Sequence, residues 1–206
     1  DPTDFGTPTG REVNWKHTPV ERLRALMTDE PGNSAAIAYD LDGVEALLVP
    51  AEEGDASYGE FFRPEDRPSA LAWKHAPRGL HLQLPAGAEL PGPITLPITG
   101  AGPEGRAFGQ ILIEALPNSR GTVVLQHSGS AQYAQNVEII VRDGAHLTVV
   151  SVQRWDEDAV HAAAHQARVD RDAALTHFVV SFGGGVVRVN PTVELAGAGS
   201  EARLYG

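Results

Sequence analysis

The sequence contains no cysteine among its 206 residues. This stretch of chain therefore cannot hold an iron–sulfur cluster through thiolates, form a CxxC redox pair or use a cysteine nucleophile. Disulfide bonds are excluded for the same reason. Their absence does not fix the compartment, because a secreted protein of this size can fold without them.

Basic residues and long apolar runs are also scarce. Sixteen Lys and Arg residues stand against 27 Asp and Glu residues, which gives a formal net charge of -11. Nucleic acids and anionic membranes are bound through basic patches, so neither is expected as a partner. No run of about 18 apolar residues is present, and no membrane span is expected. With 42% hydrophobic residues the chain can still build a substantial core.

The N-terminal part predicts one helix. The chain starts at Asp1 without a methionine or a signal-peptide pattern, so we expect the natural N-terminus to lie upstream. Thr18 as N-cap, Pro19 at the first helical position and Glu21 three residues after Thr18 form a predicted capping box. The apolar residues that follow at helical spacing are Val20, Leu23, Leu26 and Met27. The helix should end at Asp29–Gly32.

Residues 33–78 give a weaker pattern. Short apolar runs at Ala35–Ile37 and Val44–Val49 alternate with acidic loops such as Glu52–Asp55. We interpret this part as a small mixed α/β cap. Residues 1–78 are thus predicted to form an N-terminal helical or mixed region, ahead of a second region over 79–206.

From Gly79 onward the sequence predicts strands separated by turns. Residues 79–85 alternate apolar and polar side chains, and a second strand is expected around Ile94–Leu96. Further along, Asp143–Val150 resembles Arg171–Phe178 at an offset of 28 residues and Ala198–Tyr205 at a further offset of 27. An earlier copy, Arg120–Leu125, precedes the first by about 26 residues.

A fixed period of this kind predicts a β-solenoid, specifically a parallel β-helix over 79–206. The alternative is a two-sheet sandwich built from hairpins, which would not require a fixed period. Because the chain ends at Gly206 in the middle of a repeat, we expect the natural solenoid to continue beyond it.

Several short motifs are candidates for sites. Gly100–Gly105 matches G-x-G-x-x-G, but Pro97 should interrupt the preceding strand and Gln110–Ile113 reads as a strand rather than a helix. A surface loop is therefore favoured over a dinucleotide site. Gly183–Gly185 is expected to form a turn between coils, and His127 has no acidic residue nearby in sequence.

His161 and His165 would share one face of a helix and could hold a metal there. The repeat, however, aligns His165 with Val137, which opens a predicted strand. Four residues of strand span about 13 Å, too far for two ligands of one ion. We favour a strand without a metal.

Asp170 and Asp172 would lie about 6.6 Å apart along a strand. Paired carboxylates at that separation could serve an inverting glycoside hydrolase, so a carbohydrate-active β-helix enzyme is the alternative function. Asp172 aligns with Gly144 and Gly199, which favours a turn aspartate. No residue is assigned a catalytic, cofactor-binding or metal-binding role.

Three segments together resemble the SufD branch of the SufB/SufD family of iron–sulfur cluster assembly proteins. Gly10–Pro19 is similar to an N-terminal R-E-x-x-W-[RK]-[YFH]-T-[PD] signature. Gly79–Leu82, with Pro85, Gly87 and the pair Pro93-Ile94, is similar to the segment that opens the family's core. Thr122–Asn190 follows the family's coil layout.

The resemblance implies a right-handed parallel β-helix preceded by a helical region. It implies a non-catalytic, cytoplasmic scaffold subunit that acts with a SufB-type partner and a SufC-type ABC ATPase, or pairs with a second copy of itself. The cluster would be handled by the whole complex, with no cofactor bound by this segment. The family's ligand-type histidine and its ATPase-docking helices would lie beyond Gly206, so no functional residue is carried over.

Overall fold

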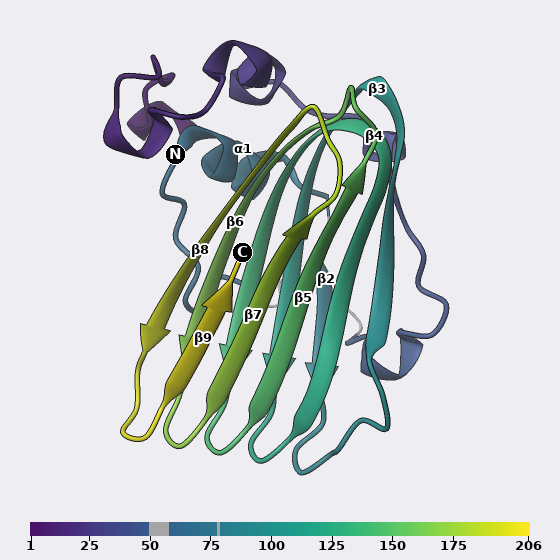
Figure 1. The fold of residues 1–206 in the computed structure, drawn as a ribbon, viewed down its shortest axis with the longest axis vertical. Coiled ribbons are helices and arrows are strands. Elements are labelled where there is room, and N and C mark those ends of the chain that lie inside the picture. Colours follow the sequence, from purple (N-terminus) through teal and green to yellow (C-terminus); the bar gives the residue numbers. More distant parts are fainter. Residues whose placement is uncertain (50–57, 78) are drawn as a thin grey trace.

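The computed structural model describes residues 1–49, 58–77 and 79–206, in which strands coil into a parallel β-solenoid of about five turns (Figure 1). The solenoid strands are β2 Leu80–Leu84, β3 Ile94–Ala115, β4 Arg120–Val141, β5 His146–Trp155, β6 Val160–Val169, β7 Ala174–Ser181, β8 Val186–Leu195 and β9 Glu201–Tyr205. Every pairing between these strands is parallel. The predicted solenoid is confirmed, and the hairpin sandwich is excluded.

Each turn of the solenoid contributes to two sheets. The front sheet contains the first halves of β3 and β4 together with β5, β7 and β9. The back sheet contains β2, the second halves of β3 and β4, β6 and β8. The 22-residue strands β3 and β4 bend from one sheet into the other, whereas later coils break at a turn.

The coil period follows the predicted repeat. Arg120 pairs with His146, His146 with Ala174 and Ala174 with Glu201, which are steps of 26, 28 and 27 residues (146 − 120, 174 − 146 and 201 − 174). One turn residue per coil has a left-handed backbone, with φ of 61°, 67°, 55° and 74° at Asn118, Gly144, Asp172 and Gly199. Such angles favour Gly, Asn and Asp, which is why these residue types recur there.

The interior of the solenoid is filled by alternate residues of both sheets. Leu125, Val149, Ile139 and Val169 are among its fully buried members. The first end of this core is closed by residues 36–48, which include β1 Ile37–Tyr39 and the 3-10 helices η4 Ser34–Ala36 and η5 Glu45–Leu47. β1 pairs antiparallel with β3. The predicted acidic loop Glu52–Asp55 lies outside the described residues.

The outer face of the back sheet is covered by N-terminal elements. These are the 3-10 helices η2 Val13–Trp15 and η3 Val20–Met27 and the helix α1 Arg67–His75, while the 3-10 helix η1 Pro2–Asp4 contacts α1. Leu23, Leu26 and Leu71 pack with Phe108 and Ala162 of the sheet. By contrast, Figure 1 shows no described element over β5, β7 and β9 of the front sheet. None of the described helices is long and apolar enough to cross a membrane.

Trp15, the aromatic residue of the N-terminal signature, is buried in this layer at 7% exposure. The guanidinium of Arg188, on β8, lies 3.9 Å from the centre of its ring. Arg188 also donates to Asp66, the N-cap of α1, at 3.1 Å. The signature tryptophan therefore anchors the N-terminal segment to the last back-sheet strand through a cation–π contact.

The predicted capping box at Thr18 is wrong. The first carbonyl of η3 to accept a helical bond is that of Pro19, from the Arg22 N–H, and no side chain of the described residues caps this helix. The Thr18 N–H is already bonded to the Trp15 carbonyl, so Thr18 belongs to the preceding turn. Of the four apolar residues predicted at helical spacing, Leu23, Leu26 and Met27 are buried and Val20 is partly buried against the same layer, and the predicted end of the helix before Asp29 is confirmed.

Two other local predictions need correction. Pro97 does not interrupt its strand but lies within β3, opposite Gln126. Gly100–Gly105 accordingly lies within β3 as an irregularity between Ala101 and Arg106 rather than in a separate loop, and no helix follows it. Gly183–Gly185 joins β7 to β8 within one coil rather than linking two coils.

The left-handed turns give a test of the coil geometry. We expect Asp172→Gly to raise the free energy of unfolding by about 0.5–1 kcal/mol, because glycine adopts φ of 55° without a Cβ penalty. Gly144→Ala should lower it by about 1–2 kcal/mol, since the new Cβ would also meet Asn118 Oδ1. Urea denaturation measures both. Equal effects of the two substitutions would contradict this account of the turns.

Candidate functional site

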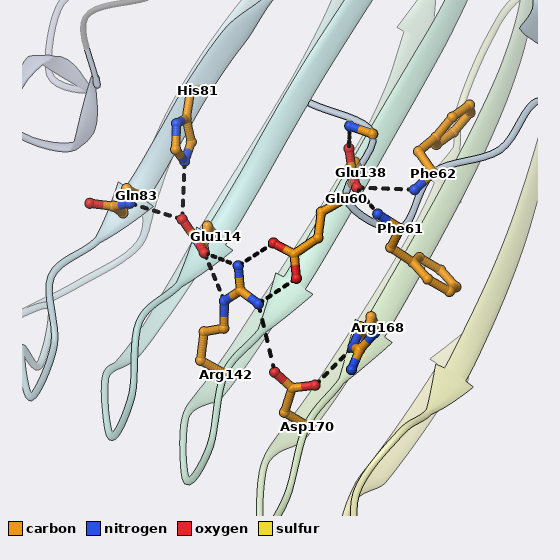
Figure 2. Close-up of polar contacts among 11 residues, drawn as sticks. Glu60, Phe61, Phe62, His81, Gln83, Glu114, Glu138, Arg142, Arg168 and Asp170 are labelled. Carbon is orange, nitrogen blue, oxygen red and sulfur yellow. Dashed lines mark hydrogen bonds and ion pairs between the residues drawn. The ribbon is translucent and has the colours of Figure 1, made fainter. Parts of the chain in front are cut away.

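The described residues offer two polar clusters, one on the outer face of the back sheet and one inside the solenoid. Figure 2 shows the first, which we call the outer cluster: His81, Gln83, Glu114, Glu138, Arg142, Arg168 and Asp170, with Glu60 from the N-terminal region. The side chains of the sheet lie side by side because β2, β3, β4 and β6 pair in register, and Arg142 and Asp170 directly follow β4 and β6.

Arg142 is the centre of the outer cluster. Its guanidinium forms a two-pronged ion pair with Glu60, with Nη1 and Nη2 donating at 2.7 and 2.6 Å. Its Nε donates to Glu114 at 2.8 Å, and Nη1 lies 3.9 Å from Asp170. Bidentate pairs of this kind fix orientation as well as adding energy. Arg142 therefore ties the N-terminal segment at residue 60 to three neighbouring coils.

Glu114 is held ionised by its neighbours. His81 Nε2 lies 3.4 Å from its carboxylate, and Gln83 donates to it at 2.8 Å. His81 is the largest cause that lowers the pKa of Glu114, to about 2, with Gln83 and Arg142 adding to it against the effect of partial burial. A carboxylate with so low a pKa does not act as a general acid or base near neutrality.

Glu138 is the most deeply buried carboxylate of the outer cluster, at 1% exposure. It accepts backbone N–H bonds from Gly59 at 2.7 Å, Phe61 at 2.7 Å and Phe62 at 3.0 Å. On the next coil, the Gln166 amide accepts from the Arg63 N–H at 2.8 Å and donates to the Arg63 carbonyl at 2.7 Å. Side chains of the back sheet thus satisfy the backbone of residues 59–63, which forms no strand there.

The second cluster lies inside the solenoid, and we call it the interior column. Its members, all buried, are Tyr133, Gln135, His127, Ser151, Gln153, Trp155, His161, His165 and His177. Trp155 Nε1 donates to Gln153 at 2.7 Å, and Gln153 donates to Ser151 at 2.8 Å. His127 Nε2 lies 3.0 Å from Gln135 Oε1. His165 Nδ1 lies 2.9 Å from His177 Nε2.

Burial keeps the histidines of the interior column neutral. It lowers the pKa of His127 and of His177 to about 4. Burial also lowers the pKa of His161 and His165 well below the usual value, and the neighbouring histidines add to this effect. His161 Nε2 and His165 Nε2 have no hydrogen-bond partner in the described part of the protein. Chemically, this column offers neutral imidazoles and amides in a buried setting beside aromatic rings.

The predicted strand at His161 and His165 is confirmed, since both lie on β6 and His165 pairs with Val137 of β4. Each histidine has a separate partner: His161 Nδ1 lies 3.2 Å from the Tyr133 carbonyl, and His165 contacts His177. Over residues 1–49, 58–77 and 79–206, no three His, Asp or Glu side chains are grouped so that they could hold a metal ion.

Asp170 and Asp172 make separate contacts. Asp170 Oδ1 accepts from Arg168 at 2.9 Å, within the outer cluster. Asp172 occupies the exposed left-handed turn position, as the alignment with Gly144 and Gly199 predicted. The sequence did not predict the roles of Glu138, Arg142 or Gln166. The interior column did leave a signal, because its histidines fall at positions that the repeat aligns with buried apolar residues, such as His177 with Val149.

Comparison with known proteins identifies the chain at the level of a family. Residues 98–206 match the family model described as "SUF system FeS cluster assembly, SufBD core domain". The chain belongs to the SufBD family. It is 34% identical over 205 residues to iron-sulfur cluster assembly SufBD family proteins of Mycobacterium bovis, Mycobacterium tuberculosis and Mycobacterium leprae.

These alignments cover 98% of this chain but only 51–52% of each relative, so the chain spans about half the length of the curated relatives it matches. No solved structure matches the chain. The predicted SufB/SufD family is confirmed, while its SufD branch stays a prediction. The matched core domain runs from within β3 to the last residue of the chain. It therefore contains most of the solenoid and every residue of the interior column.

The role of Glu138 in holding the backbone of residues 59–62 can be tested by substitution. We expect Glu138→Gln to lower the free energy of unfolding by about 2 kcal/mol, because an amide replaces a buried carboxylate that accepts three N–H bonds. Urea denaturation measures the loss, and hydrogen exchange should quicken at Gly59, Phe61 and Phe62. Glu157→Gln, at an exposed turn, is the matched control and should change neither. Unchanged protection at residues 59–62 would contradict the assigned role.

The interior column predicts acid sensitivity. Histidines with folded pKa values near 4 and unfolded values near 6.5 bind more protons when unfolded, so stability should be full above pH 6.5 and should fall as pH drops toward 4. Each such histidine contributes up to about 1.4 kcal/mol per pH unit in that window. Urea denaturation at several pH values measures the slope. In His177→Leu the slope of the unfolding free energy against pH should be smaller by the contribution of one histidine. A wild-type stability independent of pH over this window would contradict the prediction.

Proposed function

We propose that this chain is the β-helical stem of a non-catalytic scaffold subunit of the SufD branch. In this proposal it acts in the cytoplasm with a SufB-type partner and a SufC-type ABC ATPase to assemble iron–sulfur clusters. The observation that carries the proposal is the match of the SufBD core domain to residues 98–206, which are the residues that build most of the solenoid.

The assignment to the SufD branch is supported by two features of the sequence. Residues 10–19 carry the N-terminal signature, and its Trp15 is a buried anchor rather than an exposed side chain. The sequence has no cysteine, which fits the SufD branch better than SufB, although the cluster-related cysteine of SufB would be expected late in the chain, as the family's ligand-type histidine is. In this proposal the segment binds no cofactor of its own, and the cluster is cargo of the whole complex.

The charges of the outer cluster also support a scaffold. Arg142, Arg168 and their carboxylate partners are tied to one another or to the N-terminal segment, so they hold the fold together. A glycan-active enzyme would need a pair of carboxylates free to act on substrate. The pair considered for that role, Asp170 and Asp172, is split between an ion pair and an exposed turn. The carbohydrate-active alternative is therefore not supported.

Co-expression tests the proposal. The gene's complete product and the 206-residue chain are each co-expressed with SufB-type and SufC-type proteins, purified by affinity and sized by light scattering. We expect the complete product to form a stable complex with both partners. The measured mass separates pairing with a SufB-type protein from pairing with a second copy. No association of either form with either partner would contradict the proposal.

The 206-residue chain in this experiment separates two contributions. Binding by the complete product but not by the 206-residue chain would place the docking surface outside residues 1–206. A Glu157→Gln variant of the complete product serves as the matched control, since Glu157 is exposed and belongs to neither polar cluster. It should associate as the wild type does.

A further inference from the structure

The outer face of the front sheet, over which no described element lies (Figure 1), carries a polar groove. Its volume is about 280 Å³, and its lining includes Arg120, Thr122, His146, Thr148 and Glu89. Arg120 pairs in register with His146, and Thr122 with Thr148. The four side chains therefore stand at the corners of a rectangle of about 4.8 by 6.8 Å, set by the strand spacing and the two-residue repeat of a strand.

A loop forms one wall of this groove. Leu90 donates its N–H to the Arg120 carbonyl at 2.9 Å, and Arg120 donates its own to Ala88 at 2.8 Å. These bonds hold Gly92 and Pro93 beside the threonines as part of the lining. They also place Glu89 next to Arg120, its partner in an isolated β-bridge. The groove is thus built on backbone that is fixed by hydrogen bonds on both sides.

The donor groups of the groove are free. Within the described part of the chain, no hydrogen bond or ion pair engages the Arg120 guanidinium, the His146 imidazole or the hydroxyls of Thr122 and Thr148. Neighbouring carboxylates along the same turns are engaged elsewhere: Asp143 pairs with Arg171 at 2.8 Å and Glu201 with Arg203 at 3.1 Å. Despite the net charge of -11, the groove thus holds an unpaired cation and three further polar groups able to donate hydrogen bonds.

We propose that this groove binds a phosphate group through Arg120, His146, Thr122 and Thr148. The Arg120 fork matches two phosphate oxygens, and the imidazole and the two hydroxyls reach the others from the neighbouring corners. A tetrahedral oxyanion suits donors that arrive from several directions better than a planar carboxylate does. Among residues 1–49, 58–77 and 79–206, Glu89 has no ion-pair partner within 4.0 Å, and its carboxylate can accept a hydrogen bond from the hydroxyl of a protonated phosphate.

Calorimetric titration of the whole chain with inorganic phosphate tests the site. We expect saturable binding that weakens about tenfold or more in Arg120→Gln, since a charge-assisted pair is lost. Arg154→Gln is the matched control, because Arg154 is an exposed arginine on the same face of the front sheet but outside the groove. It should bind phosphate as the wild type does. Equal weakening in both variants, or no phosphate binding at all by the wild type, would overturn the proposal.

Glu89 supplies a second, independent readout. Near pH 6, where phosphate keeps protons and sulfate has none, the wild type should prefer phosphate. Glu89→Gln should remove that preference, chiefly by improving sulfate binding. A preference unchanged in Glu89→Gln would overturn the assigned role of Glu89 and with it the choice of a phosphate.

The phosphate source is distinguished by parallel arms. Vesicles of phosphatidylcholine with phosphatidic acid test a lipid headgroup, and glycerol phosphate tests a soluble monoester. Binding in either arm that is lost in Arg120→Gln supports the site and identifies the source. Loss of phosphate binding in Thr148→Val at unchanged stability would show that the hydroxyl contributes directly.

Discussion

The structure depends on the parallel hydrogen bonding of each coil to the next. The inner strands β4 to β7 satisfy their backbone on the strands one turn before and one turn after them, rather than on strands of their own coil. Each turn must therefore bring the chain back into register with the preceding coil. The left-handed residues at Asn118, Gly144, Asp172 and Gly199 allow this. The period of 26–28 residues, the two sheets and the two polar clusters all follow from that constraint.

The same constraint divides the side chains into an inner and an outer set. Inside, in-register stacking brings His127, His161 and Trp155 within 5.0–5.4 Å of one another, measured between ring centres. Outside, it brings together carboxylates and arginines of three neighbouring coils, and Glu138 and Gln166 of this outer set bind the backbone of residues 59–63. The back sheet is covered through these contacts and through the apolar layer under α1 and η3, while the front sheet keeps its polar groove open.

The solenoid could be predicted from the sequence because its determinants are local and repeated. Asp172 was predicted to be a turn residue from its alignment with two glycines, and its φ of 55° shows why the alignment holds. The contacts of Glu138 and Gln166 could not be predicted, because their partners lie 76–103 residues away and occur once rather than periodically. The prediction of a capping box at Thr18 was wrong for a local reason. The Thr18 N–H donates to the Trp15 carbonyl, and the helix starts one residue later than predicted.

The attachment of residues 59–63 also bears on the order in which the protein can fold. These residues leave the ribosome well before Glu138 and Gln166, on whose side chains their backbone depends. Until β4 and β6 have been synthesised and paired, the N-terminal segment cannot pack against the back sheet, and its apolar side chains remain accessible to solvent. Contacts of such long sequence separation are slow to form. Closure of the N-terminal segment should therefore be a late step, and the growing chain should be most prone to aggregation just before it.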